Sequence, residues 1–187
     1  CSYLGRSNTS ARKRVSSSEL HNHHFEITDC TVYNLIQGTS GIDTLTGTSG
    51  DDRIEGSANV TDRFGDGNDR LIGGAGDDLL DGGQENHPTG GSYVDTYVFG
   101  TGSGNDQVVG FFTGGSEYYD RIEIVSGING TDITSSSDVL SRLSSNADGD
   151  AVIDLGGGNT IALKGVSSSE LKNHHFEITD STVYNII

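Results

Sequence analysis

Residues 64–81 read FGDGNDRLI followed by GGAGDDLLD, two nine-residue units placed end to end. Each unit has a glycine-rich first half, an aspartate at its sixth position and an apolar residue at its eighth position. Glycine adopts positive φ at little steric cost, so the first half can turn sharply and aim its carbonyl oxygens inward. Strand side chains alternate between faces, so the three residues after each aspartate form a short strand whose middle residue enters the core.

Further copies of this nonapeptide occur on both sides of residues 64–81. They are residues 38–46 (GTSGIDTLT), 47–55 (GTSGDDRIE), 90–98 (GGSYVDTYV) and 101–109 (TGSGNDQVV). Residues 56–63 form a degenerate copy one residue short, and residues 82–89 form an interrupted turn with the only proline. We predict core positions at the eighth residues, namely Leu45, Ile54, Phe64, Leu71, Leu80, Tyr97 and Val108.

The composition requires something to neutralise negative charge before this chain becomes compact. The 187 residues carry a net charge of −16 and only 32% hydrophobic residues, close to the signature of disorder. Two carboxylates about 5 Å apart repel by roughly 3 kcal/mol at an effective dielectric near 20. A divalent cation between them makes the net electrostatic interaction attractive. The charge argues against nucleic acid or anionic membranes as partners. No apolar run is long enough to span a membrane. The two cysteines, Cys1 and Cys30, do not make a disulfide scaffold.

A long internal repeat divides the chain. Residues 15–36 (VSSSELHNHHFEITDCTVYNLI) return as residues 166–187 (VSSSELKNHHFEITDSTVYNII), 151 positions later. We therefore interpret residues 1–36 as the degenerate tail of a preceding module or a linker, with a disordered start over residues 1–14. Residues 37–109 are predicted to form a parallel β-roll. Residues 110–187 are predicted to form a small antiparallel β cap with a C-terminal strand and a short helix near 137–144, because solenoids need their open ends covered.

The nonapeptides strongly resemble the RTX family of secreted bacterial proteins, over residues 38–109. Repeats of the form G-G-x-G-x-D-x-U-x are a known calcium-binding β-helix pattern. The resemblance implies a secreted, all-β protein with a right-handed parallel β-roll, several Ca²⁺ ions in the loops and export by a type I system. It also implies that one loop gives the carbonyls of its second and fourth residues plus its aspartate. The next loop on that side then gives the carbonyls of its first and third residues plus its own aspartate.

Counting residues 56–63 as one repeat places Asp43, Asp62, Asp78 and Asp95 on one side of the roll, and Asp52, Asp69 and Asp106 on the other. The resemblance then implies four ligand sets. The first is Thr48, Gly50, Asp52, Phe64, Asp66 and Asp69. The second is Ala58, Val60, Asp62, Gly73, Ala75 and Asp78. The third is Thr39, Gly41, Asp43, Ser57, Asn59 and Asp62. The fourth is Gly74, Gly76, Asp78, Gly90, Ser92 and Asp95.

A narrower resemblance is to the R-modules of secreted mannuronan C5-epimerases, which are acidic tandem modules of about this length. It implies covalent linkage to neighbouring modules or a catalytic domain and contact with an alginate-like polysaccharide. Arg53 and Arg70 both occupy seventh positions, and the alternation above places them side by side on an outer sheet face. An anionic polysaccharide contact would help to explain such a pair of like charges, and ordinary surface charge is the alternative interpretation.

Other motifs have simpler interpretations. The pairs His23–His24 and His174–His175 suggest zinc, but neighbouring strand residues point to opposite faces, which favours a polar cap edge. Residues 146–150 (NADGD) begin like an EF-hand loop but lack its glycine and glutamate positions, so a hairpin turn is predicted. Tyr118 and Tyr119 are candidates for stacking on a sugar. No nucleophile–base pair, HExxH motif or phosphate loop indicates catalysis.

The sequence therefore predicts a non-catalytic calcium-binding module that folds outside the cell and supports polysaccharide binding by an attached enzyme. The alternative is a structural spacer or adhesin segment, or the C-terminal type I secretion domain of a secreted protease or lipase.

Overall fold

The computed structural model describes residues 33–56, 67–83, 93–114 and 118–180. These residues belong to one compact unit, residues 33–187. Our expectations for residues 1–32, and the predicted ligands Ser57, Ala58, Asn59, Val60, Asp62, Phe64, Asp66, Gly90 and Ser92, lie outside the described residues.

The parallel roll consists of eight short strands. They are β1 (Asn34–Gln37), β2 (Thr44–Thr46), β3 (Asp52–Glu55), β4 (Arg70–Ile72), β5 (Leu79–Asp81), β6 (Thr96–Phe99), β7 (Asn105–Val109) and β8 (Arg121–Val125). Strands β4 and β5 are the three residues that follow the aspartates of the sequence quoted first.

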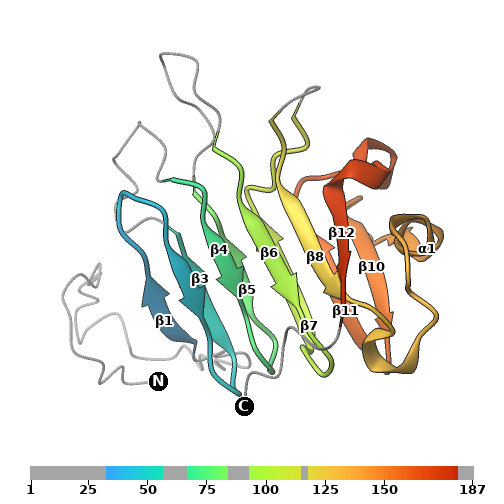
Figure 1. Ribbon diagram of the computed structural model, residues 1–187, viewed down its shortest axis with the longest axis horizontal. Helices are drawn as coiled ribbons and strands as arrows, with labels where there is room; N and C mark the ends of the chain where they lie inside the picture. Colours follow the sequence, from blue (N-terminus) through green and yellow to red (C-terminus); the bar gives the residue numbers. More distant parts are fainter. Residues whose placement is uncertain (1–32, 57–66, 84–92, 115–117, 181–187) are drawn as a thin grey trace, which may run out of the picture. The chain divides into compact units, whose positions relative to one another are not determined.

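Consecutive strands alternate between two sheets (Figure 1). Strands β1, β3, β5 and β7 lie next to one another in a seven-stranded sheet, and β2, β4, β6 and β8 in a five-stranded sheet. Every pairing among these eight strands is parallel. Each coil of the chain thus gives one strand to each sheet, which confirms the predicted parallel β-roll.

The non-repetitive part extends both sheets. Its elements are η1 (Ile128–Gly130), α1 (Ser136–Ser141), β9 (Leu143–Ser145), β10 (Ala151–Gly156), β11 (Asn159–Leu163), η2 (Ser168–Glu170), η3 (Asn173–His175) and β12 (Phe176–Thr179). Strand β11 pairs with β7 in parallel, and β10 and β9 follow in antiparallel order. Strand β12 pairs in parallel with β8. The helix is shorter than predicted because residues 143–145 join β10 as a strand, and the division of the chain at residues 36 and 109 stays a prediction.

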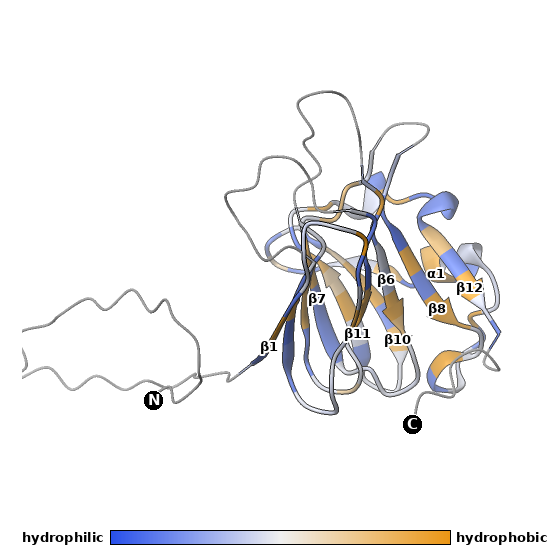
Figure 2. Cartoon of the chain, turned by 60° about the vertical axis from the view of Figure 1, so that its left-hand side comes forward, coloured by the Kyte–Doolittle hydropathy of each residue, from blue (hydrophilic) through white to orange (hydrophobic). Residues whose placement is uncertain are grey.

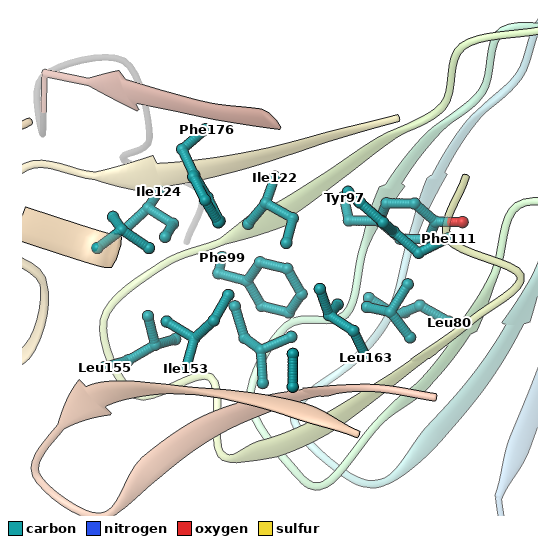
Figure 3. Close-up of a cluster of buried hydrophobic side chains, with 14 of the residues drawn as sticks. Leu80, Tyr97, Phe99, Phe111, Ile122, Ile124, Ile153, Leu155, Leu163 and Phe176 are labelled. Atoms are coloured by element: carbon teal, nitrogen blue, oxygen red, sulfur yellow. The ribbon is translucent and has the colours of Figure 1, made fainter. Parts of the chain in front are cut away.

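The core lies between the two sheets and is built from the eighth positions of the repeats. Ile54, Leu71, Leu80, Tyr97 and Val108 are all 0% exposed, and Leu45 is partly buried. Figure 2 shows hydrophobic residues concentrated on the strands. Figure 3 shows the core continuing into the cap, where Phe99 and Ile122 face Ile153 and Leu163. Burial of one such large side chain stabilises the fold by about 1.5–3 kcal/mol. Because residues of the roll and of the cap belong to the same buried cluster, the two parts share one hydrophobic core.

The strand pairing corrects the predicted side of several aspartates. Strand β4 pairs directly with β2, and β5 pairs directly with β3, so residues 56–63 do not count as a coil. Asp52 and Asp69 are 17 residues apart instead of 9, because an extra eight residues lengthen the connection. One column therefore contains Asp43, Asp69, Asp95 and Asp120, and the other contains Asp52, Asp78 and Asp106.

The stacked turns approach so closely that some positions admit only glycine. A Cβ on Gly74 would lie 2.1 Å from the carbonyl oxygen of Thr48 in the neighbouring turn, and the φ of Gly74 is +105°. Gly50, two residues beyond Thr48, is different, because a Cβ built there meets nothing within 4 Å. The distance between coils therefore depends on particular glycines.

We predict that Gly74→Ala destabilises the folded chain by about 2 kcal/mol or more, since it combines backbone strain with overlap onto a carbonyl oxygen. Gly50→Ala is the matched control and should change the free energy of unfolding by less than about 0.5 kcal/mol. Thermal unfolding in calcium measures both. Equal effects of the two substitutions would contradict the close stacking.

Candidate metal sites

Buried aspartates form a hydrogen-bonded column on each side of the roll. On one side the amide of Asp52 donates to Asp78 Oδ1 at 2.8 Å, and the amide of Asp78 donates to Asp106 Oδ1 at 3.0 Å. These three residues are 0–2% exposed. Each aspartate thus uses one carboxylate oxygen to join its coil to the preceding coil.

The opposite column has the same construction. The amides of Asp43, Asp69 and Asp95 each donate to an Oδ1 one coil further on, at 2.9, 2.8 and 2.8 Å. The acceptors are the next members of the column, Asp69, Asp95 and Asp120. Asp120 also accepts the amide of Phe112 through Oδ2 at 2.9 Å, which closes this column. Sequence reasoning missed Asp120, although the apolar Ile122 two residues later repeats the spacing of a nonapeptide.

The hydrogen bonding of the second carboxylate oxygen, Oδ2, differs between the first coils and the later ones. Asp52 Oδ2 accepts the amide and the hydroxyl of Thr48 at 2.5 and 3.0 Å, and Asp43 Oδ2 is bonded in the same way by Thr39. Glycine replaces this threonine in the later turns, at Gly74 and Gly102. The Oδ2 atoms of Asp78 and Asp106 are buried without a hydrogen-bond partner.

An unpartnered anionic oxygen in a protein interior is unfavourable unless a cation binds it. The turns around this column pack closely, because a Cβ on Gly73 would lie 2.3 Å from Asp78 Oδ2 and a Cβ on Gly104 would lie 2.1 Å from the Gly76 carbonyl oxygen of the preceding coil. Calcium prefers six to eight oxygen ligands from carboxylates and carbonyls. The residues present therefore fit calcium.

The corrected stacking changes which loops share a site. The loop of Asp52 lies beside the loop of Asp78, not beside that of Asp69, so the predicted first set is wrong in its pairing. The fourth set is wrong for the same reason, since Asp78 stacks with Asp52 and Asp106 and not with Asp95. The second and third sets both use Asp62, which lies outside the described residues, and among the described residues Asp43 bonds to Asp69.

Applying the same ligand rule to the observed neighbours gives two sets on this side of the roll. One set is Thr48, Gly50, Asp52, Gly73, Ala75 and Asp78. The other set is Gly74, Gly76, Asp78, Thr101, Ser103 and Asp106. The carbonyl of Thr48 accepts the amide of Ala75 at 3.3 Å, and Ser103 is 3% exposed. The role of these residues as ligands stays a prediction.

Side chains alone do not complete either site. Within the described residues, no group of three or more His, Cys, Asp or Glu side chains converges. Each site therefore draws on one or two carboxylates and on backbone carbonyls, which selects a hard cation such as calcium over zinc.

Burial changes the titration of the column. It raises the pKa of Asp106 to about 8 and the pKa of Asp78 to about 6, although a backbone amide bonded to each carboxylate opposes the effect. Neighbouring carboxylates, including Asp52 beside Asp78, raise both values further. At neutral pH Asp106 is therefore mostly protonated and Asp78 mostly ionised, so a cation that binds Asp106 displaces its proton.

A second ladder lies on the surface, at the fifth position of the repeat. The amide of Asp77 donates to Asp51 Oδ1 at 2.9 Å, and the amide of Asn105 donates to Asp77 Oδ1 at 2.8 Å. These side chains reach toward the next coil, opposite in direction to the buried column. Sequence reasoning missed this ladder, though the recurrence of Asp or Asn at position five was visible.

The predicted arginine pair is wrong. Arg53 lies on β3 in the seven-stranded sheet and forms an ion pair with Glu55, whose Oε1 is 2.5 Å from Nε. Arg70 lies on β4 in the other sheet and forms an ion pair with Glu123 at 2.5 Å. The extra residues in the β3–β4 connection moved Arg70 to the opposite sheet.

The histidine prediction also needs correction. His174 and His175 belong to η3 and not to a strand, and their ring centroids are 4.2 Å apart. His175 is buried, accepts the amide of Lys172 through Nδ1 at 2.9 Å and contacts the Thr113 carbonyl through Nε2 at 3.1 Å. The contact with Thr113 attaches the cap segment before β12 to the chain that follows β7. Residues 146–150 form the predicted turn of the β9–β10 hairpin, where Asp150 pairs with Lys164.

Comparison with known families agrees with this geometry. The RTX calcium-binding nonapeptide repeat matches residues 34–59 and 65–86, in four copies. The chain carries RTX repeats. Repeats of this family bind calcium ions, so calcium is the cofactor of the roll.

Two solved structures resemble the fold. One is the extracellular lipase LipA from Serratia marcescens, at 21% identity and a TM-score of 0.40, over 78% of this chain and 21% of that chain. The other is the AlgE6R3 subunit from the Azotobacter vinelandii mannuronan C5-epimerase, at 25% identity and a TM-score of 0.40, over 80% of this chain and 84% of that chain. No curated protein sequence matches the chain.

We predict that Asp78→Asn weakens calcium binding about tenfold or more, because it removes one anionic ligand oxygen. The same change should stabilise the calcium-free chain, since a buried neutral amide replaces a buried charge. Asp77→Asn is the control, because Asp77 is adjacent but exposed. Calorimetric titration and unfolding in chelator measure both effects. Equal loss of affinity in the two variants would contradict the assignment.

The raised pKa values predict opposite pH dependence with and without calcium. A carboxyl whose pKa is higher when folded stabilises the fold below its ordinary value near 4 and loses this contribution as pH rises through the folded pKa. The calcium-free chain should therefore lose stability from about pH 5 to pH 8, through the values of Asp78 and Asp106. Calcium affinity should rise over the same interval. Below pH 4, protonation of Asp150, whose pKa is lowered to about 2 chiefly by its Lys164 hydrogen bond, adds a separate loss. Melting temperatures measured in chelator across this range that stay flat or rise would contradict the prediction.

Proposed function

We propose that this chain is a non-catalytic module of a secreted bacterial protein that folds outside the cell when it binds calcium. The observation that carries the proposal is the pair of buried, unpartnered oxygens, Asp78 Oδ2 and Asp106 Oδ2, inside stacked glycine turns. Ions that bind only the folded state stabilise it by mass action, by about 2.7 kcal/mol at a concentration 100 times Kd. With a net charge of −16, the chain has little else to offset its repulsion.

Calcium control of folding suits export by a type I system, which carries unfolded chains. At the low calcium concentration of the cytosol, the carboxylates of the column repel one another and the chain remains expanded. Outside the cell, calcium drives the coils together. The described part of the chain includes no helix with the length and apolarity needed to cross a membrane.

We predict that circular dichroism shows little β structure in excess chelator at pH 7.5 and a cooperative gain of β structure on calcium addition. Magnesium at the same concentration should have a much smaller effect, because it demands octahedral geometry and dehydrates reluctantly. The proposal would be contradicted by a chain that is equally folded and heat-resistant in chelator.

The second part of the proposal is contact with an anionic, alginate-like polysaccharide on behalf of an attached enzyme. The outer face of the five-stranded sheet supports it. Arg70, Thr96 and Arg121 occupy one row of this face in register, which places the two arginines about 10 Å apart. Arg121 is exposed, and its guanidinium carbon lies 5.7 Å from the ring centroid of Tyr119. A cation beside an aromatic ring suits a uronate, which presents a carboxylate and an apolar sugar face.

We predict that alginate oligomers bind the calcium-loaded chain and that Arg121→Gln reduces the affinity about fivefold or more. Arg53→Gln is the control, because Arg53 lies on the other sheet. Calorimetry measures both variants. Absence of binding to the unmodified chain would remove this part of the proposal and favour a spacer, an adhesin segment or a C-terminal secretion domain, while leaving calcium-driven folding in place.

A further inference from the structure

One buried hydroxyl group of the roll makes no hydrogen bond. Ser103 is 3% exposed, and its Oγ is buried without a partner among the described residues. Ser103 belongs to the turn that ends at Asp106, whose Oδ2 is buried in the same condition. A buried hydroxyl without a hydrogen bond is unfavourable, so a ligand for Ser103 Oγ is expected.

The cap buries this turn. The amide of Gly102 donates to Asn129 Oδ1 at 2.8 Å, and the amide of Gly104 donates to Asn159 Oδ1 at 2.8 Å. Asn129 belongs to η1 and Asn159 is the first residue of β11, so the cap holds the residues on both sides of Ser103. The hydroxyl between them is therefore excluded from solvent.

The equivalent position differs in the other two turns on this side of the roll. Ser49 and Ala75 are the third residues of their turns, as Ser103 is of its own, and both are exposed. The second position differs as well. The amide of Thr48 donates to Asp52 Oδ2, whereas the amide of Gly102 donates to the cap. Of these three turns, only the last combines an unpartnered carboxylate oxygen with a buried hydroxyl.

The two unpartnered oxygens of the last turn lie near each other. Burial raises the pKa of the Asp106 carboxyl, and the nearby Ser103 hydroxyl opposes part of that rise. The two oxygens nevertheless lack the geometry of a hydrogen bond. Neighbouring oxygens that do not bond to each other suit a shared hard cation.

We propose that Ser103 Oγ is a ligand of the calcium ion held between the turns of Asp78 and Asp106, in addition to the oxygens that the ligand rule supplies. This assignment rests on the proposed function, calcium binding by the roll. The rule supplies the carbonyls of Gly74, Gly76, Thr101 and Ser103 and the carboxylates of Asp78 and Asp106. That set is the lower limit of the six to eight oxygens that calcium accepts, so the hydroxyl takes a place that water otherwise fills.

The additional ligand makes this site the tighter of the two on the column. In the site between Asp52 and Asp78, the counterpart of Ser103 is Ala75, which has no side-chain oxygen. Asp52 Oδ2 also accepts two hydrogen bonds from Thr48, which a cation at that oxygen must displace. The site beside the cap therefore has the higher calcium affinity.

The first test removes the hydroxyl. Ser103→Ala should weaken the tightest calcium site about fivefold or more in a calorimetric titration, because one ligand oxygen is lost. Ser49→Ala is the matched control, since it makes the same change at the same repeat position in an exposed turn. The control should change that affinity by less than about twofold.

The second test separates a ligand from a residue that only supports the fold. Ser103→Cys replaces a hard oxygen with a soft thiol, so this variant should lose calcium affinity as Ser103→Ala does. It should also bind cadmium, with the ultraviolet absorption of a cadmium–thiolate bond. Cys1→Ser and Cys30→Ser accompany every chain in this test to remove the other thiols. Ser49→Cys is the control and should not show this absorption at the same cadmium concentration.

The outcomes distinguish this inference from the proposed function. Equal calcium affinity of Ser103→Ala and Ser49→Ala would overturn the inference, as would the absence of cadmium–thiolate absorption in Ser103→Cys. Either result leaves the proposed function in place when the unmodified chain binds calcium. An unmodified chain that binds no calcium would overturn both.

Discussion

The structure depends on stacking one carboxylate above another at the spacing of parallel strands. Each buried aspartate accepts an amide from the preceding coil through Oδ1, as Asp78 does from Asp52, and this contact joins the coils. The same stacking brings negative charges within reach of one another in an interior that solvates them poorly. The fold therefore depends on a counter-charge, which RTX repeats supply as calcium.

The other features of the roll follow from that requirement. Glycines such as Gly74 let the turns approach until carbonyl oxygens and carboxylates occupy one confined space. Apolar eighth positions such as Leu80 fix each turn above the next by filling the gap between the sheets (Figure 3). Threonines at the second position, as at Thr48, saturate the first carboxylates, and their replacement by glycine leaves Asp78 and Asp106 open to a cation. The cap then covers the far end of both sheets through β11 and β12.

Much of this arrangement could be predicted from the sequence, because the period of nine fixes both the turn and the buried residue of each strand. Leu71 and Leu80 lie where the pattern predicts them. The side of the roll on which each aspartate lies could not be predicted. Residues 56–63 resemble a degenerate repeat in the sequence, yet β2 pairs directly with β4, so no further coil separates the two strands. Because these residues were counted as a repeat, the prediction placed Asp69 and Arg70 on the wrong side of the roll. Asp120 was missed because the six residues before it, 114–119 (GGSEYY), are one more than the five that precede the aspartate of a nonapeptide, and only the folded chain shows that it ends a column.

Amide hydrogen exchange at Asp52 and Asp78 is the most direct test of the central claim, because these amides donate to the next carboxylate in the column. The account predicts strong protection of both amides at calcium concentrations 100 times Kd. It also predicts a loss of protection of about 100-fold in excess chelator at neutral pH. Protection that is the same with and without calcium would show that the carboxylates stack without a metal ion, and would contradict the account.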